Sequence, residues 1–148
     1  MLQWEGQDLL TPSSRGFVYL IINVPEEKLY IGKKKMVSER RVAVAGRVNK
    51  KIVRTPSNWK TYYGSCKPLL ADLERLGKNN FRRIVLGSWS ELHSVNYAEA
   101  HLQFALGVLS DGKHNGFKFY NRNIKITTMR YPTDTEYIKR VERILKGL

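Results

Sequence analysis

Residues 16–34, GFVYLIINVPEEKLYIGKK, contain two short apolar runs on either side of a Pro-Glu-Glu turn, and each run carries a tyrosine. The first run, residues 17–22, is apolar at both alternating sets of positions and is rich in β-branched and aromatic residues. This composition is typical of a strand buried on both faces. Residues 28–31 follow the turn and predict the returning strand. The stretch therefore predicts an antiparallel β-hairpin.

The two tyrosines of this hairpin are expected to share one face of the sheet. If the turn centres on Val24 and Pro25, antiparallel pairing places Tyr19 directly opposite Tyr30, and a slip of two residues makes them diagonal neighbours. A cross-strand aromatic pair that only stabilises the hairpin fits the same pattern. From the strands alone, a structural role and a catalytic role for the two phenols both stay open.

The composition indicates a single basic domain. The chain has 148 residues, 42% of them hydrophobic, which supports one domain, residues 1–148, around one core. It carries 26 Lys and Arg against 13 Asp and Glu, a net charge of +13. This excess favours nucleic acid as a partner, with an anionic membrane surface as the alternative. Because the sequence has no long apolar run and no signal peptide, we expect no membrane partner and a cytoplasmic protein.

A basic arm, residues 33–56, follows the hairpin. Its first 22 residues carry nine Lys or Arg and one Glu. No helical or strand period is sustained, although residues 37–47 would admit a helix, so we expect a solvated, partly flexible arm. Such a run is often only a solvated surface, but its density here favours a segment that follows DNA phosphates. The candidate DNA-binding residues are Lys33, Lys34, Lys35, Arg41, Arg47, Lys50, Lys51 and Arg54.

The remaining patterns predict an α+β protein. A helix is expected to begin at Ser65 and end before Gly77, because Ser is a good N-cap and Gly a good C′ residue. Residues 81–86 predict a third strand. A second helix is expected over residues 95–109, a hairpin at the Asn-Gly pair of residues 115–116, and a last helix over residues 134–146.

The second helix carries a carboxylate near its apolar side. The predicted apolar stripe is Val95, Ala98, Leu102, Ala105 and Leu109. At about 100° per residue, Glu99 lies about 20° from Leu106, at the edge of this stripe. A carboxylate directed toward a core needs a partner. It is either a boundary glutamate paired with a basic side chain, or a metal ligand or acid–base group.

The order of these motifs resembles the GIY-YIG nuclease family. Val18-Tyr19 and Tyr30-Ile31-Gly32 correspond to the two half-motifs, Arg40 follows ten positions after the second tyrosine, and Glu99 and Asn121 come later in the family's order. The segments GFVYLI, LYIGKK, NWKTYYGS and YAEAHLQF are similar to the small phage-encoded SegE-like endonucleases, over a core of about residues 16–124.

The resemblance implies a small three-stranded antiparallel sheet flanked by helices, here with an extra C-terminal hairpin and helix. It also implies a metal-dependent endonuclease acting on double-stranded DNA in the host cytoplasm, with no small-molecule cofactor. Glu99 would hold one Mg²⁺ or Mn²⁺ and Arg40 would clamp the scissile phosphate. Tyr19 or Tyr30 would activate water, with Lys33 and Arg40 favouring the phenolate, and Asn121 would brace the site.

The sequence also departs from the family pattern. No histidine follows directly after Arg40, so any role that a family member gives to such a histidine would fall to another group. Lys60, Tyr62 and Tyr63 are the candidates, and Lys60 and Tyr63 are assigned to the catalytic set. Sequence preference would come from the basic arm or the C-terminal helix, and two cuts would need a homodimer or sequential nicking. The rival hypothesis is a non-catalytic basic DNA-binding module, which has no need for a glutamate facing phosphate.

Overall fold

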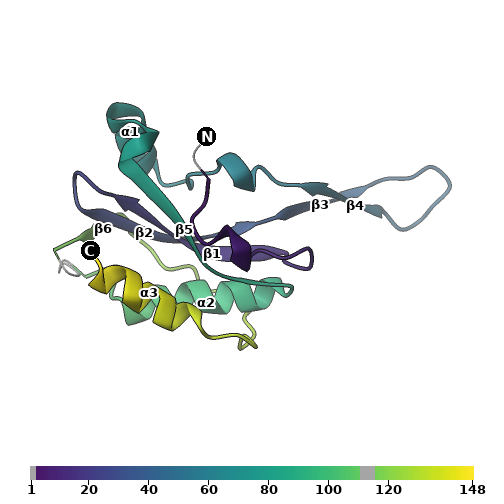
Figure 1. The fold of residues 1–148 in the computed structure, drawn as a ribbon. Coiled ribbons are helices and arrows are strands. Elements are labelled where there is room, and N and C mark those ends of the chain that lie inside the picture. The colour runs from purple at the N-terminus through teal and green to yellow at the C-terminus, as the bar shows by residue number, and fades with distance from the viewer. Residues whose placement is uncertain (1–2, 111–115) are drawn as a thin grey trace.

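The computed structural model describes residues 3–110 and 116–148 (Figure 1). Its strands are β1 (Gly16–Asn23), β2 (Lys28–Lys35), β3 (Val37–Val42), β4 (Lys51–Pro56), β5 (Phe81–Trp89) and β6 (Lys118–Phe119). Its α-helices are α1 (Lys67–Leu76), α2 (Leu92–Ala105) and α3 (Tyr137–Lys146), and its 3-10 helices are η1 (Gln7–Leu9), η2 (Trp59–Thr61) and η3 (Lys78–Asn80). These elements confirm the predicted α+β class.

The main sheet is built around β1, in the order β5-β1-β2-β6. β1 pairs antiparallel with both β2 and β5, which confirms the predicted three-stranded antiparallel sheet. β6 adds two residues parallel to β2. The described part of the predicted C-terminal hairpin, from Gly116 onward, lies beside β2, with Phe117 and Phe119 buried in the core. Asn115, which suggested the turn, lies outside the described residues.

The hairpin register follows the diagonal alternative. Tyr19 lies opposite Gly32, and Tyr30 lies opposite Ile21. The direct Tyr19–Tyr30 pairing is wrong by two residues. A two-residue slip keeps every side chain on its own face, so the two phenols still share one side of the sheet.

Both faces of the sheet are covered (Figure 1). α2 and α3 pack on one face, and α1 with the N-terminal segment lies on the other. Alternate residues of β1 enter different core clusters: Val18, Leu20 and Ile22 on the α2–α3 side, and Phe17, Tyr19 and Ile21 on the other side, with Trp4 and Leu69. The two-sided burial expected for the first strand is confirmed.

The helix boundaries differ from the predicted ones by a few residues. α1 has Cys66 in place of Ser65 at its N-cap, and Gly77, with φ 88°, ends it as expected. α2 stops at Ala105, so Leu109 is 49% exposed and lies outside the predicted apolar stripe. α3 begins at Tyr137, later than predicted. Within the described residues, no helix combines the length and the apolar character needed to cross a bilayer.

The basic arm forms a β-ribbon. β3 and β4 pair antiparallel from Val37 opposite Pro56 to Val42 opposite Lys51, and the ribbon projects from the body of the molecule (Figure 1). The helix that residues 37–47 would admit does not form, and the arm is a paired ribbon, with most of its side chains exposed as expected of a solvated segment. The two-residue period is weak in the sequence because neither face of the ribbon is covered, so neither face needs to be apolar.

Candidate active site

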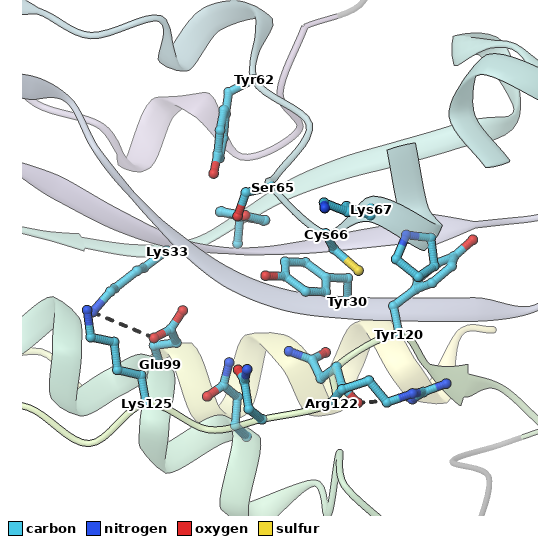
Figure 2. A pocket seen from close by; sticks show the side chains of 15 residues that line it. Tyr30, Lys33, Tyr62, Ser65, Cys66, Lys67, Glu99, Tyr120, Arg122 and Lys125 are labelled. Carbon is cyan, nitrogen blue, oxygen red and sulfur yellow. Dashed lines mark hydrogen bonds and ion pairs between the residues drawn. The ribbon is translucent and has the colours of Figure 1, made fainter. Parts of the chain in front are cut away.

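An open cavity of about 510 Å³ lies between β2, α2, the start of α1 and the segment after β6 (Figure 2). Its walls carry the phenols of Tyr19, Tyr30, Tyr62 and Tyr120 and the cations of Lys33, Lys67, Arg122 and Lys125. Among the described residues that line it, Glu99 supplies the one carboxylate. The cavity is therefore a basic hollow with a single anion, a composition suited to a phosphate-containing ligand.

The Tyr19 and Tyr30 rings lie side by side in this cavity. Their centroids are 6.1 Å apart, and the Tyr62 ring stands edge-on to Tyr19 at 6.2 Å. Gly32 lies beneath them, and a Cβ built on it would fall 2.5 Å from the Tyr19 oxygen and 2.7 Å from Tyr30 Cε1. The glycine of the second half-motif is therefore needed because two aromatic rings occupy the space above its Cα.

Burial keeps both phenols protonated. It raises the pKa of Tyr30 to about 12 and the pKa of Tyr19 well above its ordinary value, and Glu99 adds to both shifts. The expectation that Lys33 and Arg40 would favour the phenolate is therefore wrong. Desolvation is the largest influence on each phenol, and Arg40 does not line the cavity. At neutral pH, these tyrosines can orient water through hydrogen bonds, but they are not ready-made bases.

Glu99 is 8% exposed and faces Lys33 (Figure 2). The Lys33 Nζ lies 3.8 Å from Glu99 Oε1 and donates a hydrogen bond of 2.6 Å to Asn96 Oδ1. Burial raises the pKa of Glu99 and lowers the pKa of Lys33, while the attraction between the two opposes both shifts. The boundary pairing considered from the sequence is thus present, and Lys33 balances the carboxylate in the free chain.

The oxygen donors beside Glu99 fit a hard divalent cation. Gln103 lies one helical turn further along α2 and also lines the cavity, and its buried Oε1 has no hydrogen-bond partner among the described residues. Carboxylate and amide oxygens are the ligands that Mg²⁺ and Mn²⁺ prefer. In the described part of the chain, no three His, Cys, Asp or Glu side chains gather around one point. The donor set therefore suits an ion that keeps most of its coordination for water and substrate.

Asn121 braces β2 at Ile31, between Tyr30 and Gly32. The Ile31 N–H donates to Asn121 Oδ1 at 3.1 Å, and Asn121 Nδ2 donates to the Ile31 carbonyl at 2.8 Å. Gln103 Nε2 donates to the same carbonyl at 3.0 Å. These bonds fix the backbone on both sides of Ile31, and with it the positions of Tyr30 and Gly32.

Comparison with known protein families identifies the family of the chain. A family model described as "Putative endonuclease segE, GIY-YIG domain" matches residues 4–124. The chain belongs to this SegE-type GIY-YIG family. No curated protein and no solved structure matched. The match begins before residue 16, where the resemblance was expected to start, and Trp4 is buried in the core while Glu5 forms a β-bridge to Ile84.

Three residues of the predicted catalytic set do not reach the cavity of this SegE-type chain. Arg40 is exposed in the middle of β3, and Lys60 is exposed on η2. Tyr63 is buried, with the Arg83 guanidinium 4.2 Å from the centre of its ring. Tyr62 lines the cavity instead, because neighbouring side chains of this extended segment point to opposite sides. Arg83 holds the segment by donating to the carbonyls of Lys60 and Tyr62 at 3.2 and 2.9 Å.

The candidate DNA-binding residues divide between a second cavity and the ribbon. Lys33, Lys34 and Lys35 line the second cavity, of about 440 Å³, which shares Lys33 and Lys125 with the first. The candidates on the β-ribbon and its tip are all exposed: Arg41, Arg47, Lys50, Lys51 and Arg54. A basic surface therefore runs from the candidate active site toward the base of the ribbon.

Sequence reasoning missed several lining residues, among them Lys67, Gln103, Arg122 and Lys125. Gln103 had a usable signal, since it follows Glu99 by four positions and so lies on the same side of the helix. Lys67 is the first residue of α1, a helix that the sequence predicted. Arg122 and Lys125 follow Asn121 in a segment without regular structure, where no periodic signal exists.

Proposed function

We propose that this SegE-type protein is a metal-dependent endonuclease that hydrolyses phosphodiester bonds of double-stranded DNA. The supporting observation is Glu99, a nearly buried carboxylate in a cavity whose other charged side chains, among the described residues, are all cations. Burying a carboxylate is costly. A surface that only bound phosphate would gain nothing from an anion facing its ligand, whereas a hydrolytic site needs one to hold a cation.

The cations of the cavity are assigned to phosphate binding. Lys33 and Lys125 lie beside Glu99 and would neutralise the phosphate as charge builds up during hydrolysis (Figure 2). Arg122 lines the same cavity on the Tyr120 side, where it donates to the carbonyls of Phe119 and Asn121. A bound Mg²⁺ or Mn²⁺, held by Glu99 and by waters, would supply Lewis-acid stabilisation. Arg40 is proposed to contact a phosphate further along the strand, because it shares a face of β3 with Ser38, which lines the second cavity.

The phenols are assigned to orienting the attacking water. Tyr30 is the better candidate because it is only partly buried, whereas Tyr19 is 1% exposed. A neutral phenol can accept a hydrogen bond from water and fix its direction of attack without becoming a phenolate. Tyr19 then supports the Tyr30 ring, and Asn121 supports the strand that carries it.

The test is cleavage of supercoiled plasmid with Mg²⁺ or Mn²⁺, with EDTA as the metal-free arm. Glu99→Gln is expected to reduce the rate about 100-fold or more, since it removes the carboxylate and keeps the shape. The matched control is Glu142→Gln, the same change at an exposed glutamate on α3, and this variant is expected to cut at the wild-type rate. Equal cleavage by both variants would contradict the assignment of Glu99.

The first product of plasmid cleavage distinguishes one active site acting alone from two acting together. Nicked circles that accumulate before linear DNA would indicate sequential nicking by one chain. Linear DNA produced directly would indicate a homodimer with two sites.

A non-catalytic DNA-binding module is the second candidate function. The Lys33–Glu99 pair favours it, because Lys33 already balances the carboxylate without a metal ion. This function predicts salt-sensitive retardation of DNA in gels with no cleavage under either metal. That result would replace the endonuclease proposal.

A further inference from the structure

The β3–β4 ribbon is a two-stranded hairpin without a core. Six residue pairs form it, and most of its side chains are exposed on both faces. Val48, at the tip, is 102% exposed and Ile52 is 47% exposed. An isolated two-stranded hairpin is marginally stable in water, and exposed apolar side chains add nothing to its stability. An element of this kind is best explained by a surface on which it lies when the protein is at work.

The charge of the ribbon indicates the kind of surface. Residues 37–56 contain six Lys or Arg and one Glu, a net charge of +5. The single acidic residue, Glu39, is itself engaged by Arg15 and Arg54. The charge that remains is complementary to DNA phosphates, and the exposed arginines can also form paired hydrogen bonds with guanine.

The shape of the ribbon fits one groove of the duplex. Its strands lie about 5 Å apart, and with side chains the ribbon is about 10 Å thick. The major groove of B-DNA is about 12 Å wide and admits a two-stranded ribbon, whereas the minor groove, at about 6 Å, is too narrow for one. The major groove also presents a distinct hydrogen-bond pattern for each base pair.

The ribbon is fixed to the body beside the candidate active site. The Arg15–Glu39–Arg54 contacts tie the first residues of β3 and the last of β4 to the chain before β1. Ser38 and Ser57, at the base of the ribbon, line the second cavity, which shares Lys33 and Lys125 with the active-site cavity. A duplex held at the active site would therefore continue toward the ribbon.

We propose that the β3–β4 ribbon enters the major groove next to the cleavage position and reads base edges there. Arg41 is assigned to guanine and its cross-strand neighbour Ile52 to thymine methyl groups, since the two are directly opposite and share one face. This inference rests on the proposed function and adds the source of sequence preference. Six strand residues span about 20 Å, so the contacts extend about six base pairs to one side of the cut.

The experiment measures binding, so that its outcome is separate from cleavage. The Glu99→Gln chain is incubated with a pool of 40-base-pair duplexes randomised in the middle, in EDTA, and bound sequences are selected and read. Enrichment of guanine at defined positions is expected. Arg41→Ala in the same background should lower affinity for the selected duplex about tenfold or more and abolish the enrichment.

Two further variants distinguish base reading from simple charge. Arg41→Lys keeps the positive charge but loses the guanidinium fork, so it should retain most of the affinity and lose the guanine preference. Lys139→Ala, on the exposed face of α3, removes an equal charge elsewhere and should retain both. Preference retained by Arg41→Lys and Arg41→Ala would overturn the proposal, as would the absence of any enrichment.

Methylation of the duplex identifies the groove. Dimethyl sulfate modifies guanine N7 in the major groove and adenine N3 in the minor groove, so one reagent probes both. Interference from guanine N7 on one side of the bound site is expected, and interference from adenine N3 alone would overturn the assignment. If wild-type protein binds in this way but cuts no plasmid, the endonuclease proposal fails and the ribbon proposal stands. If it cuts but shows neither enrichment nor N7 interference, the reverse holds.

Discussion

Replacing Gly32 with alanine tests whether the shared phenol face depends on a single missing side chain. The new Cβ would lie 2.5 Å from the Tyr19 oxygen and 2.6 Å from Tyr19 Cζ. Ordinary contact begins at 3.4 Å, so the phenol oxygen would have to retreat by about 0.9 Å, the difference between 3.4 and 2.5 Å. Tyr19 is 1% exposed and is carried by the central strand β1, so neither ring nor backbone can yield easily.

The cost follows from this lack of room. Overpacking a well-filled site usually costs 1–3 kcal/mol, and the rigid surroundings of Tyr19 place Gly32→Ala at about 2 kcal/mol. In a chain of this length, that loss lowers Tm by about 6 °C. A displacement of about 1 Å in a group that orients a reactant can cost about 100-fold in rate, so cleavage should fall more than the fraction folded does.

Thermal unfolding and plasmid cleavage well below Tm measure the two effects separately. Gly147→Ala is the control, because Gly147 has an ordinary φ of −81° and its nearest Cβ neighbours would be carbonyl oxygens at 3.5 and 3.6 Å. It should change neither Tm nor rate appreciably. If Gly32→Ala unfolds within about 1 °C of the wild type and cuts at the same rate, close packing of the phenols over Gly32 is not what fixes the site.

Three further predictions concern the supports of the site. Hydrogen bonds, the largest effect from Tyr120 and the next from Arg75, lower the pKa of Asp72 to about 2. The ionised Asp72 therefore stabilises the folded protein above pH 3.8, its ordinary pKa, and this contribution is lost as pH falls toward 2. Asp72→Asn should therefore lower stability near neutral pH by about 1 kcal/mol and flatten the loss between pH 4 and 2 in urea titrations. Asn121→Ala leaves a buried N–H of β2 unpaired and should cost about 2 kcal/mol in the same assay, whereas an unchanged midpoint would exclude the bracing role. Arg83→Met releases the two carbonyls that hold the Tyr62 segment, and the rate should fall together with about 2 kcal/mol of stability; a stable, fully active variant would argue against positioning by Arg83.

The hairpin and the ribbon differ in how much the sequence reveals. The strand with Tyr19 is predictable because it is buried on both faces, which leaves it apolar at every position from Phe17 to Ile22. The sequence does not predict the β3–β4 ribbon, because exposed residues such as Arg41 and Val48 need not follow an apolar pattern. Charged residues in an exposed segment are equally compatible with a helix or a loop. The register of the hairpin differs by two residues because side-chain pattern fixes the face but not the turn.

In the candidate site, too, the sequence predicts some residues and not others. Glu99 stands out in the sequence because a carboxylate at the edge of an apolar stripe is unusual. Tyr62 and Tyr63 are adjacent, and only the fold decides which of them points into the cavity. Arg40 follows the family spacing, yet that spacing counts residues along the chain, and here the chain leaves the body after β2 to form the ribbon.

The pKa values and the ion pair together limit the way in which this cavity can work. On the proposed function, two phenols that burial keeps protonated are poor proton acceptors at neutral pH, so positive charge nearby would favour ionisation of the attacking water. Lys33 is held beside Glu99 and contributes to that charge, but the carboxylate cancels most of it in the free chain. A cation bound at Glu99 would leave Lys33 free for the phosphate and would add to the positive charge of Lys67, Arg122 and Lys125 in the cavity. The proposed metal ion is thus supported by the burial of the tyrosines as well as by the presence of the glutamate.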